Sequence, residues 1–106
     1  MSPTDVKQTI AISSTDTLQK YVGTVATDIG SARLKAIQAQ ASAANASVKI
    51  YDATDATTAS TLVFEAKWAI NDGDIITFYI PQNGIRCKTA MHAVLSNCDF
   101  LVATFD

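Results

Sequence analysis

The side chains that could carry acid–base, nucleophilic or metal chemistry are few in this chain. His92 is the only histidine, so a multi-histidine metal site is excluded, and no nucleophile motif such as Gly-x-Ser-x-Gly accompanies it. It lies in residues 91–95 among Met, Ala, Val and Leu, a composition typical of a strand. We therefore expect a structural or interface histidine rather than a general acid or base.

The two cysteines, Cys87 and Cys98, have no neighbouring metal ligands in the sequence. A reducing cytoplasm keeps such residues as thiols that pack like small hydrophobic side chains. We expect two free, buried thiols, with a disulfide between them as the alternative.

Two acidic loops offer oxygen atoms, one with Asn71, Asp72 and Asp74 and one with Asp52 and Asp55. The twelve-residue spacing of an EF-hand is missing, and the first group surrounds a glycine as turns do, so we expect turns rather than a Ca²⁺ site. The four glycines form no phosphate-binding loop. No catalytic residue, metal or cofactor is therefore expected.

The composition fits one domain covering residues 1–106, in which residues 1–5 could form an N-terminal arm. Charged residues make up 17% of the chain, below the roughly 25% of typical soluble domains. This deficit indicates that part of the surface is covered by other chains. The net charge is −2 with scattered Lys and Arg, so no nucleic-acid partner is expected.

The start of the chain lacks the basic and apolar regions of a secretion signal, and no apolar run is long enough to cross a membrane. We expect synthesis in a cytoplasm and no membrane partner.

Alternation of apolar and polar residues predicts an all-β fold with about eight short strands. They are expected near residues 6–13, 32–40, 48–51, 61–68, 75–80, 85–89, 91–95 and 100–105, with a weaker extended stretch at 20–29. Asn83-Gly84 and Ser96-Asn97 are turn signals between the last strands. Strands of this kind bury one face against a second sheet, which predicts an antiparallel β-sandwich or barrel.

Within these strands we expect core packing for the aromatic residues Phe64, Trp68 and Phe78. Leu62 shares the predicted inward face of residues 61–68.

Residues 31–45 are ambiguous, because six alanines favour a helix that Ser31 would cap. The regular strand spacing around them favours a strand over residues 32–40 instead. Ile37 then falls on the face opposite Leu34 and Ala36, which requires a bulge, a second layer or a neighbouring subunit.

The last strand is apolar on both faces, with Leu101 and Phe105 on one and Phe100 and Val102 on the other. In a two-layered domain this favours an oligomer. Tyr51 and Tyr79 lie opposite the apolar faces of their strands, where tyrosine serves a partner surface or a cross-strand pair. The interface candidates are Ile37, Tyr51, Tyr79, Leu101 and Phe105.

Residues 30–106 resemble a small tailed-bacteriophage virion structural protein, similar to head decoration or cement subunits. The segments that carry the likeness are Gly30-Ser31-Ala32-Arg33-Leu34-Lys35-Ala36-Ile37, Ser47-Val48-Lys49-Ile50-Tyr51-Asp52, Ile80-Pro81 before Asn83-Gly84-Ile85-Arg86-Cys87-Lys88-Thr89, Leu95-Ser96-Asn97-Cys98-Asp99, and Val102-Ala103-Thr104-Phe105. Where the pattern has glycine after Lys88-Thr89, this chain has Ala90.

The resemblance implies a non-enzymatic β domain of the virion that binds and stabilises the major capsid protein shell. It also implies self-association, with a trimer favoured, and gives no catalytic residues to transfer. Two alternatives stay open: a tail, neck or fibre-attachment component, and a carbohydrate-binding module that stacks sugars on Tyr51, Tyr79 and Trp68.

Overall fold

The computed structural model describes residues 7–42, 45–55, 60–68, 75–81 and 84–106, and in these residues the chain is all-β with antiparallel pairing throughout. The large sheet has the order β1 (Lys7–Gln8), β11 (Cys98–Phe105), β5 (Ala32–Ala41), β8 (Ile75–Tyr79), and β9 (Ile85–Cys87) also pairs with β5. The small sheet has the order β2 (Asp16–Thr17), β10 (His92–Ser96), β6 (Ala46–Asp52), β7 (Thr61–Trp68). A separate hairpin joins β3 (Gln19–Val22) to β4 (Val25–Asp28).

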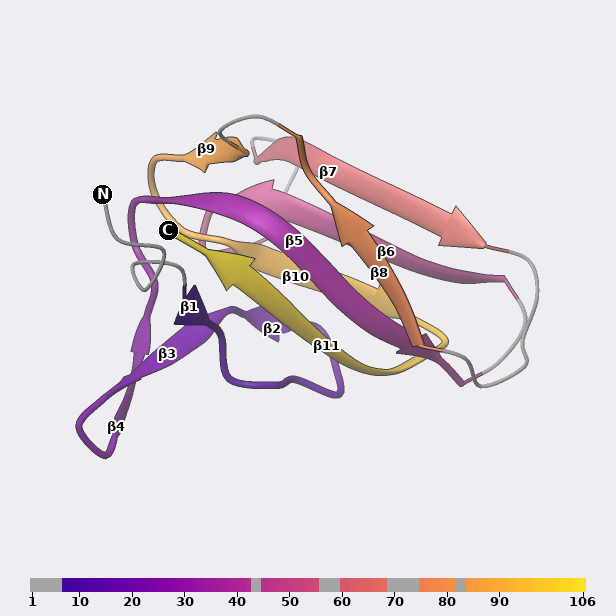
Figure 1. Cartoon of the computed structure of the whole chain (residues 1–106), viewed down its shortest axis with the longest axis horizontal. Helices are drawn as coiled ribbons and strands as arrows, with labels where there is room; N and C mark the ends of the chain where they lie inside the picture. Colours follow the sequence, from indigo (N-terminus) through magenta and orange to yellow (C-terminus); the bar gives the residue numbers. More distant parts are fainter. Residues whose placement is uncertain (1–6, 43–44, 56–59, 69–74, 82–83) are drawn as a thin grey trace.

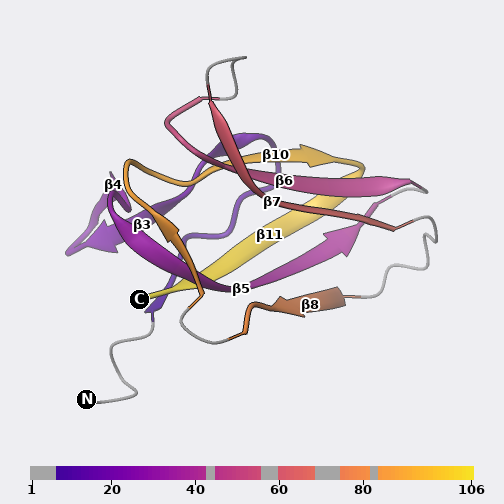
Figure 2. The ribbon, with the colours of Figure 1, turned by 90° about the horizontal axis from the view of Figure 1, so that it is seen from above.

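The two sheets form two layers, as a β-sandwich requires (Figures 1 and 2). Their inner faces supply the core, whose largest fully buried side chains are Leu18, Leu34, Ile37, Ile50, Met91, Leu101, Val48 and Cys87. Burying one such aliphatic side chain stabilises the fold by about 1.5–3 kcal/mol. The expected all-β fold is confirmed, and its layered sheets are consistent with the sandwich.

Residues 32–41 form a strand, so the alanines do not make a helix here. β5 lies in the middle of the large sheet, where pairing with β11, β8 and β9 satisfies its backbone on both edges. These hydrogen bonds and the burial of one face outweigh the helix propensity of alanine, which is less than about 1 kcal/mol per residue relative to ordinary residues.

A bulge explains the alternation break at Ile37. The register between β5 and β11 shifts between Thr104, which faces Ala36, and Phe105, which faces Leu34, so Lys35 is the extra residue. One extra residue reverses the alternation, and both Leu34 and Ile37 point into the core with no exposed surface. Of the three explanations that the sequence left open, the bulge is the one observed.

Residues with positive φ occupy the turns that the sequence signalled. Asn97 adopts φ 56° between β10 and β11, where the chain passes from the small to the large sheet. Gly84 adopts φ +78°, and a Cβ there would clash with the backbone oxygen of Leu34. Glycine is required at position 84 for both reasons.

One predicted side-chain direction is wrong. The register between β6 and β7 shifts between Ile50 and Tyr51, so Tyr51 faces Leu62 while Ile50 faces Phe64. This irregularity turns Leu62 outward, where 45% of it is exposed. Phe64 and Phe78 lie inward as expected and pack edge to face with ring centroids 5.8 Å apart.

Candidate interaction surface

Among the residues that the structure describes, no three His, Cys, Asp or Glu side chains gather as metal ligands. His92 Nδ1 lies 2.9 Å from Thr17 Oγ1, and the same hydroxyl donates to the carbonyl oxygen of Thr54 at 3.0 Å. Because that hydroxyl hydrogen is used, Nδ1 must be the donor to Thr17. The histidine ties β2 to β10 and so has a structural role.

Both cysteines are free thiols, as expected. Cys87 is buried, whereas Cys98, which was expected to be buried, is only half-buried. Burial and the nearby Asp52 carboxylate raise the pKa of Cys87 to about 11. Burial also raises the pKa of Cys98, against the hydrogen bonds to the carbonyls of Ser96 and Ser47. Neither is an activated nucleophile, because the thiolate is the reactive form.

Asp52 at the end of β6 binds the loop that follows β9. Its carboxylate accepts backbone N–H bonds from Lys88 (3.0 Å), Thr89 (2.8 Å) and Ala90 (3.4 Å). Partial burial alone would raise the pKa of Asp52, but these donors and the charge of Lys88 lower it overall. The carboxylate fixes the position of this loop. Of the two acidic loops, the Asn71–Asp74 group lies outside the described residues.

Part of the outer face of the large sheet, made by residues 36–40 of β5 and the residues paired with them, is a grid of uncharged side chains, which we call the uncharged face. Leu101, Ala103, Ile37 and Ala39 are buried on the inner face of the sheet. The residues that alternate with them along β11 and β5 point outward and form cross-strand rows. The uncharged face consists of Gln8, Thr104, Ala36 and Tyr79 in the first row, Val102, Gln38 and Thr77 in the second, and Phe100, Gln40 and Ile75 in the third.

Large apolar groups on this face are open to solvent. Tyr79 is 82% exposed and Ile75 is 52% exposed. A shallow hollow of about 220 Å³ lies between Tyr79, Gln38 and Val102. An exposed, uncharged and partly apolar sheet face is typical of a protein interaction site.

The outer face of the small sheet is different. Its rows contain Lys49, Glu65 and Lys67, and the Glu65 carboxylate lies 3.5 Å from Lys67 Nζ and 4.0 Å from Lys49 Nζ. The first of these pairs lies along β7 and the second crosses from β7 to β6, and such mixed charges suit a surface in contact with water. We call it the charged face.

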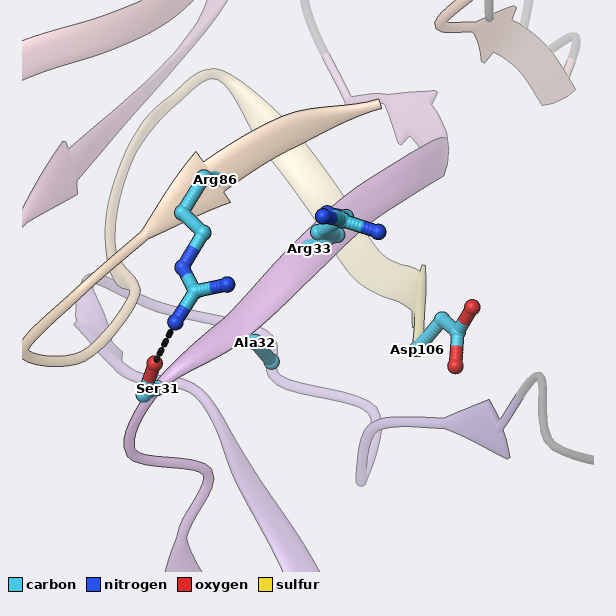
Figure 3. A pocket seen from close by; sticks show the side chains of 5 residues that line it. All are labelled: Ser31, Ala32, Arg33, Arg86 and Asp106. Carbon is cyan, nitrogen blue, oxygen red and sulfur yellow. Dashed lines mark hydrogen bonds between the residues drawn. The ribbon is translucent and has the colours of Figure 1, made fainter. Parts of the chain in front are cut away.

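The uncharged face ends at a pair of arginines on the other side of the Lys35 bulge. Arg33 on β5 is directly opposite Arg86 on β9, and Arg86 Nη2 donates to Ser31 Oγ at 3.3 Å (Figure 3). A hollow of about 190 Å³ lies between them and Asp106. Within the described residues neither guanidinium forms a salt bridge. Two adjacent guanidinium groups present planar donors that suit a carboxylate.

The β3–β4 hairpin extends away from the sandwich (Figure 1). Its tip exposes Tyr21 (64%), Val22 (56%) and Val25 (64%), and Gly23 turns the chain at φ +65°. The sequence predicts only a weak extended stretch at residues 20–29, without the turn. The available signal was a glycine between two β-branched residues, since Gly supplies the positive φ of a two-residue turn.

The five interface candidates separate into two groups. Ile37 and Leu101 have no exposed surface and Phe105 is 4% exposed, so these side chains belong to the core of the single chain and not to a surface. The bulge at Lys35 turns Ile37 inward, and Leu101 and Phe105 lie on the inner face of β11, so the single chain buries all three without a partner. Tyr79 lies on the uncharged face, and Tyr51, half-buried, lies on the outer face of the small sheet beside His92 and Leu62.

Because Tyr51 and Tyr79 lie on outer faces of different sheets, they do not form one stacking platform for a sugar. The side chain of Trp68 lies outside the described residues. No helix within the described part of the chain has the length and apolar character needed to span a membrane.

Comparison with known proteins yields no match to a protein-family model, to a curated protein or to a solved structure.

Proposed function

We propose that this protein is a non-enzymatic virion structural subunit that decorates a tailed-bacteriophage head, where it binds and stabilises the shell of major capsid protein. The observation that carries the proposal is the uncharged face, a sheet surface with exposed Tyr79 and Ile75, on the opposite side of the sandwich from the charged face. The resemblance of residues 30–106 to decoration subunits supplies the identity of the partner.

In the proposed complex the uncharged face lies against the shell. Its apolar groups supply the hydrophobic contact, and polar groups such as Gln38 and Thr77 supply hydrogen bonds. Arg33 and Arg86 lie at the end of this footprint, where they bind carboxylates of the capsid protein. The chain contributes binding and no reaction.

Stabilisation follows from linkage. A subunit that contacts capsid proteins only in the assembled shell lowers the free energy of that state and no other. Each contact then raises the temperature or internal pressure at which the shell ruptures.

The test uses purified, undecorated capsids and two matched variants that each add one negative charge. Gln38→Glu places it at the centre of the uncharged face, and Ser47→Glu places it near the start of β6 on the charged face, opposite Lys67. We expect the wild type and Ser47→Glu to bind the capsids and raise their rupture temperature, and Gln38→Glu to lose at least tenfold in affinity. Absence of wild-type binding, or equal binding by both variants, contradicts the proposal.

The projecting hairpin favours a second candidate, a subunit of the tail or neck. An arm with an apolar tip of Tyr21, Val22 and Val25 suits insertion into a neighbouring subunit of a ring. Copy number separates the two positions: hundreds of copies per particle, measured by gel densitometry against the major capsid protein, place the subunit on the head, and a dozen or fewer place it in the tail.

A further inference from the structure

β8 is an edge strand without the usual protection against pairing. In the described part of the chain it pairs with β5 alone, and its other side faces away from the sheet (Figure 2). Edge strands normally carry charge, proline or bulges that block contact with another strand. The sequence of β8, Ile-Ile-Thr-Phe-Tyr, contains none of these and consists of strong strand formers.

The other edge strands that the structure describes carry charge. In the large and small sheets β1 carries Lys7, β9 carries Arg86, β2 carries Asp16, and β7 carries Glu65 and Lys67. In the hairpin β3 carries Lys20 and β4 carries Asp28. The lack of charge is therefore specific to β8 and not a consequence of the low overall charge of the chain.

The hydrogen bond of Ile80, the residue that directly follows β8, shows which way the backbone N–H and C=O groups of β8 point. Ile80 N donates to the backbone oxygen of Lys35, so the backbone of Ile80 points toward β5. Backbone groups alternate along a strand, so those of Ile75, Thr77 and Tyr79 point to the open edge. These groups can accept a further antiparallel strand.

β8 is complementary to itself. An antiparallel pair of two β8 strands centred on Thr77 places Ile75 opposite Tyr79 on the outer face and Ile76 opposite Phe78 on the inner face. Both are apolar pairs of a β-branched and an aromatic residue, the kind that stabilise neighbouring strands. No charge is brought against another in this register.

We infer that β8 is a self-association edge through which two copies of this chain pair about a two-fold axis at Thr77. The two large sheets become one continuous sheet, and the two uncharged faces join into one surface. A two-fold contact uses both edges completely and gives a closed dimer. A trimer, as the resemblance implies, would need a separate contact.

The inference does not depend on the capsid as partner and is tested on the purified chain. Light scattering is expected to show a species of twice 11.3 kDa for the wild type. Thr77→Lys brings two lysines face to face at the axis and is expected to give the monomer, with an unchanged circular dichroism spectrum. Thr27→Lys, an exposed threonine on β4, is the matched control and is expected to remain dimeric.

Cross-linking tests the register. Paired residues at the axis of an antiparallel ladder have Cα atoms about 4.5–5.5 Å apart, within the range of a disulfide. Thr77→Cys is therefore expected to form an intermolecular disulfide under mild oxidation at least tenfold faster than Thr27→Cys. A monomeric wild type, a dimer that survives Thr77→Lys, or equal cross-linking of the two variants overturns the inference. Capsid binding by a strictly monomeric chain would overturn it while leaving the proposed function intact.

Discussion

The two outer faces of this sandwich are built on the same plan and differ in chemistry. Each consists of cross-strand rows over a buried inner face. One contains Lys49, Glu65 and Lys67, whereas the other has no charge in the rows of the uncharged face and carries Arg33 and Arg86 only beyond them. The two sheets share one core, so the fold itself does not require this difference. Charged side chains on a surface that stays in contact with water keep their hydration. On a surface that loses its water on binding, the same charges must be desolvated, which costs free energy. The uncharged face is therefore the one to test for binding.

The largest expected effect comes from comparing an inner and an outer residue of β5, because only the inner residue belongs to the core. Ile37→Ala is expected to lower the free energy of unfolding by about 2–5 kcal/mol, because it leaves a cavity at a fully buried position. Its neighbour on the outside, Gln38→Ala, is expected to change it by less than about 0.5 kcal/mol. Urea denaturation measures both. Similar losses of unfolding free energy in the two variants would contradict the assignment of Ile37 to the core and Gln38 to the surface.

The next effect concerns the junction between the uncharged face and the arginine pair. Gly84→Ala is expected to cost about 1–3 kcal/mol, because the residue needs positive φ and its Cβ meets the backbone oxygen of Leu34. Gly30 has nearly the same φ but open space around its Cβ, so Gly30→Ala is expected to cost only about 1 kcal/mol. Thermal denaturation of the two variants measures the difference in stability that the clash with Leu34 causes. An equal loss of stability in both variants would contradict the clash.

On the side of the small sheet, Asp52 gives the stability a pH dependence. Its pKa is lowered from 3.8 in the folded state, so its contribution is present above that value and is lost as the pH falls through the folded pKa. Asp52→Asn is expected to lose about 1 kcal/mol at neutral pH and to approach the wild type in acid. Denaturation curves from pH 7 to pH 2 check this. Parallel curves for the two proteins would argue against it.

The smallest effect concerns the charges of the charged face. Glu65→Gln removes both salt bridges of an exposed pair of lysines and is expected to cost at most about 1 kcal/mol. The difference from the wild type is expected to shrink in about 1 M salt, which screens exposed charges. Thermal denaturation at low and high salt measures it. A larger loss of stability that salt does not change would contradict the description of these salt bridges as exposed and screened by solvent.

Local sequence was sufficient for most of the strands. β5, β6, β7, β8 and the last three strands fall at residues where alternation predicted them, because period two is a property of the extended chain itself. Asn97 and Gly84 occupy turns for a similar reason, since both tolerate positive φ. The hairpin with Gly23 was missed because its exposed strands bury no apolar face and so lack the alternation that marks a strand.

Some side-chain directions were predicted less well, and two of them have the same cause. Ile37 and Leu62 are both displaced from their expected faces by irregularities in register, one in β5 and one between β6 and β7. A bulge is fixed by the partner strand, which the local sequence does not contain. Tyr79 was selected correctly as an outward residue, since β8 has no such irregularity among its pairs.

The sequence alone determined that the chain is all-β and where most strands lie, because these depend on neighbours along the chain. Only the tertiary structure decided which apolar residues form the core, which face lacks charge, and which edge strand is left unprotected. These depend on strand order and register, in which residues far apart in the sequence, such as Gln8, Thr104 and Tyr79, come to lie in one row.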